Sequence, residues 1–233
     1  MSNNKQFPLD TKEHCIYYLW RIISSCELCM DSFKDFNKET EEILQEFKGK
    51  DRLPYYIYTS ISNKTSNVMC YILNLLGDCQ TTSISYFKYR KQAQKLINRG
   101  NTDIKILTIN EDSLVNKLLI EFNKQRNWQN HVPESILLSE LELLEQGKIC
   151  LDLDPVKIHH YNYVTYEWFE DLYNGNKHFY ENARIIIQAA KRDYSLLQGK
   201  TIEYPREYID IPVAPKKAEA VQMSAKIQGI FNI

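Results

Sequence analysis

Hydrophobic residues recur at intervals of three and four positions over most of the chain, which is the pattern of amphipathic helices. The predicted helices cover residues 11–33, 38–48, 60–76, 82–99, 114–128, 133–145, 166–173 and 177–198. Polar stretches that contain glycine or asparagine end most of them, at Gly49, Gly77-Asp78, Gly100-Asn101, Gly147 and Asn174-Gly175-Asn176. In the two helices that flank residue 131, the positions expected to face the core are Leu114, Leu118, Leu119, Phe122, Ile136, Leu137, Leu141 and Leu144.

Several stretches do not follow the helical period. Residues 50–58 form a connector whose tyrosines either stack on nucleic-acid bases or cover the edge of the core. Residues 103–109 are rich in β-branched side chains, and residues 149–153 alternate between apolar and polar side chains, so both predict short extended segments. Residues 199–217 contain three prolines, which indicates an extended arm, and a short helix is expected within residues 218–230.

The expected fold is all-α. The helices are predicted to form one up-and-down helical bundle over residues 10–198, with short extended additions and an extended C-terminal arm over residues 199–233. A composition that is 43% hydrophobic and 12% aromatic supports a packed core. The first ten residues are polar and no apolar run is long enough to cross a bilayer, so we expect no signal peptide, no membrane contact and a cytoplasmic location.

The six cysteines are scattered along the sequence, and Cys26 and Cys29 form the one close pair. A zinc site of the common structural type needs a second close pair, and a thioredoxin-like motif needs a preceding strand. We therefore expect reduced, mostly buried thiols, no metal site and no cofactor.

The net charge of −1 excludes a surface that is basic throughout, so any contact with nucleic acid has to be local. The segment 82–99 is the best candidate, because it interleaves cations with tyrosine and phenylalanine and contains no acid. Its candidate RNA-binding residues are Lys88, Arg90, Lys91, Lys95 and Arg99. The alternative interpretation is an ordinary solvated helix face.

Residues 126–131 contain the chain's only arginine that precedes a histidine by five to seven positions. Arg126 is a permanent cation whose planar fork fits phosphate oxygens, whereas His131 can move a proton near neutral pH. Cleavage of RNA by its own 2′-hydroxyl needs one group for the proton and one for the charge of the phosphorane. The two side chains would point about 140° apart on one straight helix. Pro133 predicts a break between two helices, which brings both groups to one junction.

The Arg-Asn-x-x-x-His pattern at a helix junction of an all-helical chain resembles the HEPN superfamily (higher eukaryotes and prokaryotes nucleotide-binding domains). The match covers this motif and the helical character of residues 10–200. The resemblance implies a metal-independent endoribonuclease in which Arg126 stabilises the phosphate, Asn127 positions the site and His131 is the acid or base. It also implies a homodimer with a composite active site, a role in toxin–antitoxin or abortive-infection defence, and an antitoxin or other regulatory protein as partner.

Other interpretations remain open. The motif alone is equally consistent with an arginine at a helix end and a histidine that caps the next helix on an ordinary surface. A non-catalytic helical module of the same fold would use Arg126 and His131 to hold a nucleotide or a protein. A DNA-binding regulator ranks lower, because the sequence has no helix-turn-helix pattern with a basic recognition helix.

Overall fold

The computed structural model describes residues 7–80, 83–107, 110, 113–130, 132–148, 150, 160–208 and 223. The chain divides into two compact units, Met1–Ile202 and Glu203–Ile233. The helices and strands named below all belong to the first unit. In the second unit, residues 203–208 form neither helix nor strand, and the short helix expected within residues 218–230 lies, apart from Met223, outside the described residues.

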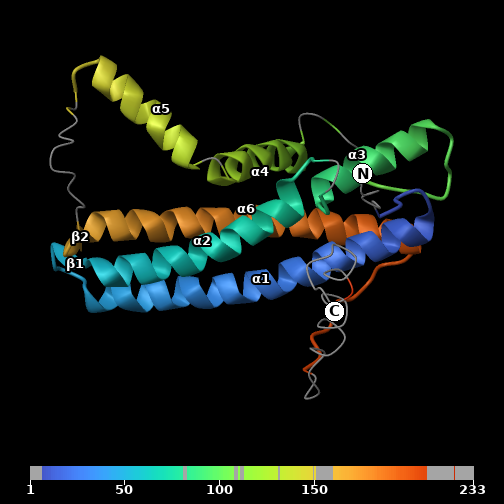
Figure 1. Cartoon of the computed structure of the whole chain (residues 1–233). Coiled ribbons are helices and arrows are strands. Elements are labelled where there is room, and N and C mark those ends of the chain that lie inside the picture. The colour runs from blue at the N-terminus through green and yellow to red at the C-terminus, as the bar shows by residue number, and fades with distance from the viewer. Residues whose placement is uncertain are drawn as a thin grey trace. The chain divides into compact units, whose positions relative to one another are not determined.

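Three long helices lie side by side and form the body of the first unit (Figure 1). They are α1 (Lys12–Glu46), α2 (Tyr55–Gly77) and α6 (Tyr166–Gln198). Three shorter helices accompany them, namely α3 (Tyr86–Asn98), α4 (Leu114–Asn130) and α5 (Val132–Glu145). The prediction of an all-α fold is confirmed for these residues. None of the helices in the described part of the chain has the length and apolar character needed to cross a bilayer.

α1 is one helix where the sequence predicts two, at residues 11–33 and 38–48. The hydroxyl of Thr11 caps its start by accepting a hydrogen bond from the backbone N–H of His14 at 3.2 Å. No glycine or proline interrupts the residues between the two predicted helices, so the backbone ladder continues through them. The predicted stop is confirmed, because the helix ends shortly before Gly49, whose φ of +82° is left-handed.

α6 is also continuous, so the predicted break at Asn174-Gly175-Asn176 is wrong. Asn176 is buried, whereas Gly175 faces outward, and a Cβ added to it would meet nothing within 4 Å. The packing of a long apolar face against α1 outweighs the cost of one helical glycine, which is about 1 kcal/mol relative to alanine. His178, expected at a helix start, therefore lies inside α6, where its ring hydrogen-bonds the Asn182 side chain at 3.1 Å.

Three stacked or tilted rings tie α4 to the long helices. Phe33 of α1 and Phe122 of α4 both contact Phe179 of α6, with ring centroids 5.5 and 5.1 Å apart. All three rings are buried, as is Leu119 of α4. The inward orientation predicted for Leu119 and Phe122 is therefore confirmed, and α4 is anchored immediately before the segment that carries Arg126.

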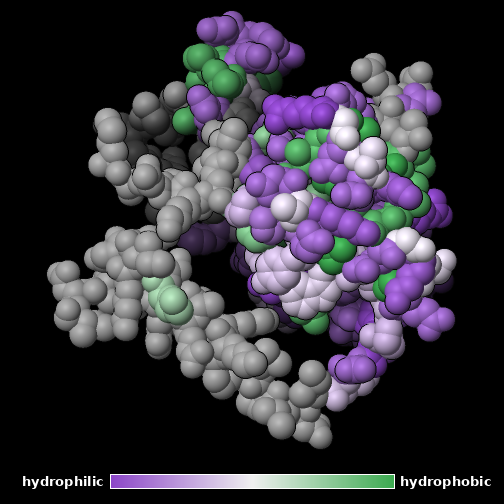
Figure 2. Space-filling view, turned by 90° about the vertical axis from the view of Figure 1, so that its right-hand side faces the viewer, coloured by the Kyte–Doolittle hydropathy of each residue, from purple (hydrophilic) through white to green (hydrophobic). Residues whose placement is uncertain are grey.

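The inward prediction is wrong for Leu114, which is exposed, and for most of α5. The exposed apolar side chains of α5 are Ile136, Leu137, Leu138, Leu141 and Leu143. In Figure 1, α5 diverges from the long helices instead of packing along them. The helical period predicted an apolar face correctly, but it does not indicate what covers that face. Figure 2 shows another face of the molecule. On that face hydrophilic side chains separate the exposed hydrophobic ones.

Two short strands pair at the end of the bundle where α2 and α6 begin (Figure 1). β1 (Arg52–Pro54) runs antiparallel to β2 (Tyr163–Thr165), with Leu53 opposite Val164. The connector predicted over residues 50–58 is thus too long, because α2 already begins at Tyr55. Of the strand expected at residues 149–153, only Cys150 lies within the described residues, and residues 103–107 form no strand.

A buried carboxylate joins α6 to α3 and to the segment after α3. Asp193 is fully buried; its Oδ2 accepts a hydrogen bond from the Tyr86 hydroxyl at 2.8 Å and its Oδ1 accepts one from the Leu107 N–H at 2.6 Å. The Arg90 side chain donates to the Leu107 carbonyl at 2.7 Å. Burial raises the pKa of Asp193 from 3.8 to about 6, against the smaller opposing effects of Leu107, Arg90 and Tyr86.

The free energy of unfolding should depend on pH through Asp193. The folded state binds the Asp193 proton more tightly than the unfolded chain does, so this contribution is fully present below the ordinary pKa of 3.8 and is lost as the pH rises through about 6. Relative to an Asp193→Asn variant, the wild type should lose about 2 kcal/mol between pH 4 and pH 7. Urea unfolding of both proteins measures this, and a difference that stays constant over that range would contradict it.

Candidate functional site

Arg126 lies near the C-terminal end of α4 and is held by three hydrogen bonds. Its Nε donates to Asn74 Oδ1 at 3.2 Å, its Nη1 to Asn127 Oδ1 at 3.1 Å and its Nη2 to Asp78 Oδ2 at 3.1 Å. Asn74 comes from α2 and Asp78 follows the end of that helix. The side chains of Arg126 and Asp78 are only 11% and 9% exposed, so this is a largely buried ion pair with its geometry set by two helices.

Gly77 allows α2 and α4 to come close enough for this contact. A Cβ added to Gly77 would lie 2.7 Å from the backbone carbonyl carbon of Phe122 and 2.8 Å from the backbone nitrogen of Asn123. The predicted helix end at Gly77-Asp78 is confirmed. The reason for the glycine is different, however, because its φ is not among the positive values and the residue serves a close backbone approach. Arg126 follows one helical turn after this contact.

Asp78 links Arg126 to the start of α3. Its Oδ1 accepts a hydrogen bond from the backbone N–H of Gln80 at 2.9 Å, and its backbone carbonyl accepts one from the hydroxyl of Ser85. Ser85 in turn caps α3 by accepting a hydrogen bond from the backbone N–H of Lys88 at 3.1 Å. The carboxylate that pairs with Arg126 is therefore fixed by the local backbone and does not depend on Arg126 alone for its position.

Arg126 retains hydrogen-bonding capacity that its contacts with the described residues do not use. A guanidinium carries five N–H bonds, and the three contacts engage one each on Nε, Nη1 and Nη2. One further N–H on Nη1 and one on Nη2 have no acceptor among the described residues. Two such donors suit the oxygens of a phosphate. The charge of Asp78 offsets part of the positive charge, so these donors would act chiefly through hydrogen-bond geometry.

α4 ends at Asn130 and α5 begins at Val132, so the helix break predicted near Pro133 falls on residue 131, which lies outside the described residues. α4 continues two residues beyond the predicted end at Trp128. Asn127 is exposed apart from its bond to Arg126, and the neighbouring indole of Trp128 is 58% exposed. His131, the predicted acid or base, lies outside the described residues.

The five predicted RNA-binding residues differ in how far their side chains are exposed. The surface position expected for Arg90 is wrong, because this side chain is buried and bonds the Leu107 carbonyl. Lys88 is half-buried; its Nζ donates to the Ser83 carbonyl at 2.8 Å, and burial lowers its pKa. The exposed cations are Lys91, Lys95 and Arg99, which recur every four residues and so lie along one side of the helix.

The sequence did not predict that Asn74, Gly77 and Asp78 contribute to the site of Arg126. A largely buried arginine needs a carboxylate partner, but 48 positions separate Asp78 from Arg126, and no local spacing relates them. A glycine at a helix end is also typical of a simple stop, which hid its packing role. Within the described residues, no three His, Cys, Asp or Glu side chains gather closely enough to hold a metal ion.

Gly77→Ala should destabilise the protein, because its Cβ has no room against the backbone of Phe122 and Asn123. We expect a loss of about 1–3 kcal/mol in the free energy of unfolding, measured by urea denaturation. Gly175→Ala is the matched control, since this glycine also lies inside a helix but faces open space. It should stabilise the protein by up to about 1 kcal/mol. Similar effects of the two substitutions would contradict the close approach of α2 and α4.

Comparisons with known proteins leave the chemistry of this site to be inferred from its own residues. No protein-family model, curated protein or solved structure matches the chain.

Proposed function

We propose that this protein is a metal-independent endoribonuclease that cleaves RNA by attack of the substrate's 2′-hydroxyl. The observation that carries the proposal is the fixation of Arg126 by three hydrogen bonds, close to the junction of α4 and α5 that contains His131. A donor that is held in place before the reaction stabilises developing charge without reorganisation. The resemblance of the Arg-Asn-x-x-x-His pattern to the HEPN motif supports the same assignment.

The proposed reaction assigns one role to each residue of the motif. His131 accepts the proton of the 2′-hydroxyl, the 2′-oxygen bonds to phosphorus, and the bond from phosphorus to the 5′-oxygen breaks. A second imidazole protonates the departing 5′-oxygen. The two N–H bonds of Arg126 that no described residue accepts bind the non-bridging oxygens of the phosphorane, and Asn127 keeps the guanidinium oriented. The products are a 2′,3′-cyclic phosphate and a 5′-hydroxyl.

A homodimer would supply the second imidazole from the other copy's His131. Support comes from α5, which begins directly after His131 and exposes five apolar side chains. An uncovered apolar helix face of this kind marks a protein-interaction surface. A two-fold contact through α5 would bring the two α4–α5 junctions toward each other, because both copies use the same surface.

The exposed cations of α3 are the proposed contacts for the RNA backbone. Lys91, Lys95 and Arg99 present charge along one side of the helix, and phosphate contacts of this kind position a strand without reading its sequence. The proposal extends to a biological role in toxin–antitoxin or abortive-infection defence, with an antitoxin or other regulatory protein as partner. That part rests on the resemblance.

The second candidate function is a non-catalytic module of the same fold that binds a nucleotide or a protein. One observation favours it: the Arg126 side chain is 11% exposed and its charge is paired with Asp78, which also suits a structural role. In that case His131 contributes to affinity, and no RNA product forms.

Purified protein should cleave labelled RNA in excess EDTA and leave cyclic-phosphate ends. His131→Ala should slow cleavage by about 10²–10⁴-fold, because the proton transfer is lost, with an unchanged melting temperature. His178→Ala is the matched control. This histidine is exposed, lies in α6 and contacts the Asn182 side chain, and it does not belong to the motif of residues 126–131. Arg126→Lys keeps the charge opposite Asp78 but removes the fork, and it should also lose activity. No product from the folded wild type, or equal cleavage by His131→Ala, would contradict the ribonuclease proposal.

The dimer is tested by placing charge on α5. Leu137→Glu and Leu141→Glu should dissociate the dimer in light scattering and reduce cleavage, because a carboxylate in an apolar contact is costly. Both side chains are at least half exposed in the single chain, so the melting temperature should change little. Leu28→Glu, on the exposed side of α1, is the matched control and should leave the dimer intact. A wild-type monomer would refute the composite active site.

A further inference from the structure

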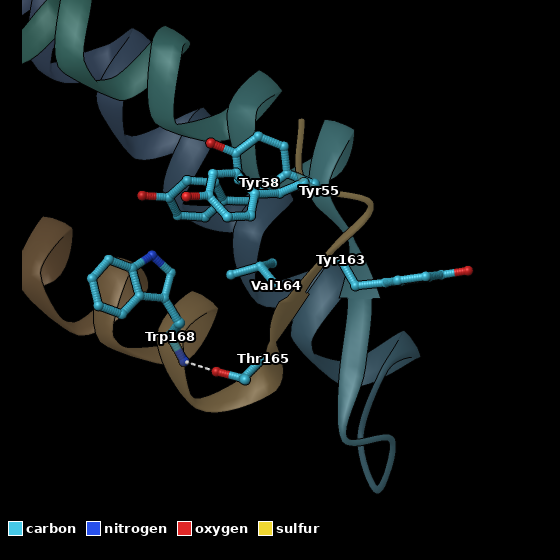
Figure 3. Close-up of a pocket in the computed structure, with 7 residues that line it drawn as sticks. Tyr55, Tyr58, Tyr163, Val164, Thr165 and Trp168 are labelled. Carbon is cyan, nitrogen blue, oxygen red and sulfur yellow. Dashed lines mark hydrogen bonds between the residues drawn. The ribbon is translucent and has the colours of Figure 1, made fainter. Parts of the chain in front are cut away.

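An aromatic cavity of about 390 Å³ lies at the end of the bundle where α2 and α6 begin (Figure 3). Five of its seven lining residues are aromatic. The lining residues are Tyr55, Tyr58, Tyr161, Tyr163, Val164, Thr165 and Trp168. The volume falls within the range of roughly 300–1,000 Å³ that is typical of small-ligand pockets. We call this feature the aromatic cavity.

The rings reach the aromatic cavity from two sides. Tyr55 stacks on Tyr58 with ring centroids 5.7 Å apart, and Tyr161 lies against Tyr55 at 5.4 Å. Figure 3 shows Trp168 across from Tyr55 and Tyr58, with Val164 between the two sides, whereas the ring of Tyr163 points away. A flat ring that enters between the phenols and the indole therefore meets aromatic faces on both sides.

Strand pairing, core packing and a helix cap hold the backbone that frames the aromatic cavity. The pairing of β1 with β2 places Val164 opposite Leu53, and Leu53 belongs to a buried cluster with Leu44, Ile61 and Phe169. The hydroxyl of Thr165 caps α6 by accepting a hydrogen bond from the backbone N–H of Trp168 at 3.2 Å (Figure 3). Side chains carried by paired strands and helix starts need little reorganisation when a ligand binds.

The lining side chains carry no charge but keep polar groups for a ligand. The hydroxyls of Tyr55, Tyr58 and Tyr161 and the indole N–H of Trp168 form no hydrogen bond with any residue that the structure describes. Trp168 is 58% exposed and Tyr161 is 64% exposed. Large aromatic side chains that surround a cavity and remain open to water are typical of binding surfaces.

We propose that the aromatic cavity binds a nucleobase, supplied by a free nucleotide or by single-stranded RNA. A base is a flat, neutral ring system that stacks on aromatic side chains, and its edge has donors and acceptors for phenol and indole groups. The absence of a cation among the lining residues leaves the phosphate in water. A quaternary ammonium, the other common ligand of aromatic cages, is disfavoured because no carboxylate lines this one.

The aromatic cavity is a separate site from Arg126. Tyr55 begins α2, and Asn74, which bonds Arg126, lies 19 positions further along the same helix. At 1.5 Å per residue this is about 28 Å. Base binding therefore stands independently of the proposed cleavage, and a strand that reaches both places would gain a second point of attachment.

Calorimetric titration of the full chain tests this proposal with four probes: AMP, ribose 5-phosphate, tetramethylammonium and a 2′-O-methyl oligoadenylate, which cannot undergo 2′-hydroxyl attack. AMP and the oligonucleotide should bind, whereas ribose 5-phosphate and tetramethylammonium should not. Trp168→Ala and Tyr161→Ala should weaken AMP binding about tenfold or more. Trp20→Ala is the matched control, because Trp20 is 45% exposed on α1 and does not line the cavity. Circular dichroism verifies that each variant is folded.

The outcomes separate the sources of the base. An oligonucleotide that binds much more tightly than AMP, with the same loss in Trp168→Ala, identifies an RNA strand, whereas similar affinities identify a free nucleotide. Binding that Trp168→Ala and Tyr161→Ala leave unchanged, equal binding of ribose 5-phosphate, or no binding of either nucleotide probe overturns the proposal. Tetramethylammonium binding that Trp168→Ala abolishes overturns it in favour of a cation cage. His131→Ala should bind AMP like the wild type, so a failure of cleavage and a failure of base binding are distinguishable.

Discussion

The close approach of two helix backbones at Gly77 is the constraint on which the candidate site depends. The end of α2 lies so near Phe122 of α4 that a single Cβ has no room between them. This approach brings Asn74 and Asp78 within hydrogen-bonding distance of Arg126, although they are far apart in the sequence. The ring contact between Phe122 and Phe179 holds α4 from the other side. The packing of the two backbones therefore fixes the orientation of the Arg126 guanidinium, because it sets the positions of the groups that bind it.

The ion pair of Arg126 and Asp78 has two consequences for function. It compensates a charge that would otherwise be costly to bury, so the arginine can be rigid and largely shielded from water. It also lowers the net positive charge that an approaching phosphate meets. A phosphate would therefore be recognised by the direction of the two unused N–H bonds, which favours a well-positioned transition state over loose attraction of any anion.

The two ends of the long helices have different chemistry. Near the end of α2 and the start of α3, charged and amide groups surround Arg126, whereas the starts of α2 and α6 carry phenol and indole rings. The two-stranded pairing of β1 and β2 aligns those helix starts, because each helix begins at the residue that follows its strand. A short sheet in a helical protein here has the effect of gathering aromatic side chains from three chain segments around one cavity.

The sequence by itself determined the helical class and most helix boundaries, because periodicity, glycine and proline act locally. It also placed Arg126 and Asn127 near the end of a helix, where α4 carries them. Only the tertiary structure decided that α6 is continuous, since its long buried face outweighs a weak local breaker such as Gly175. The same holds for the burial of Arg90, the partnership of Arg126 with Asp78, and the assembly of Tyr55, Tyr161 and Trp168 around a cavity. These depend on which helix faces meet, and that is set by packing between distant segments, which no short-range pattern in the sequence encodes.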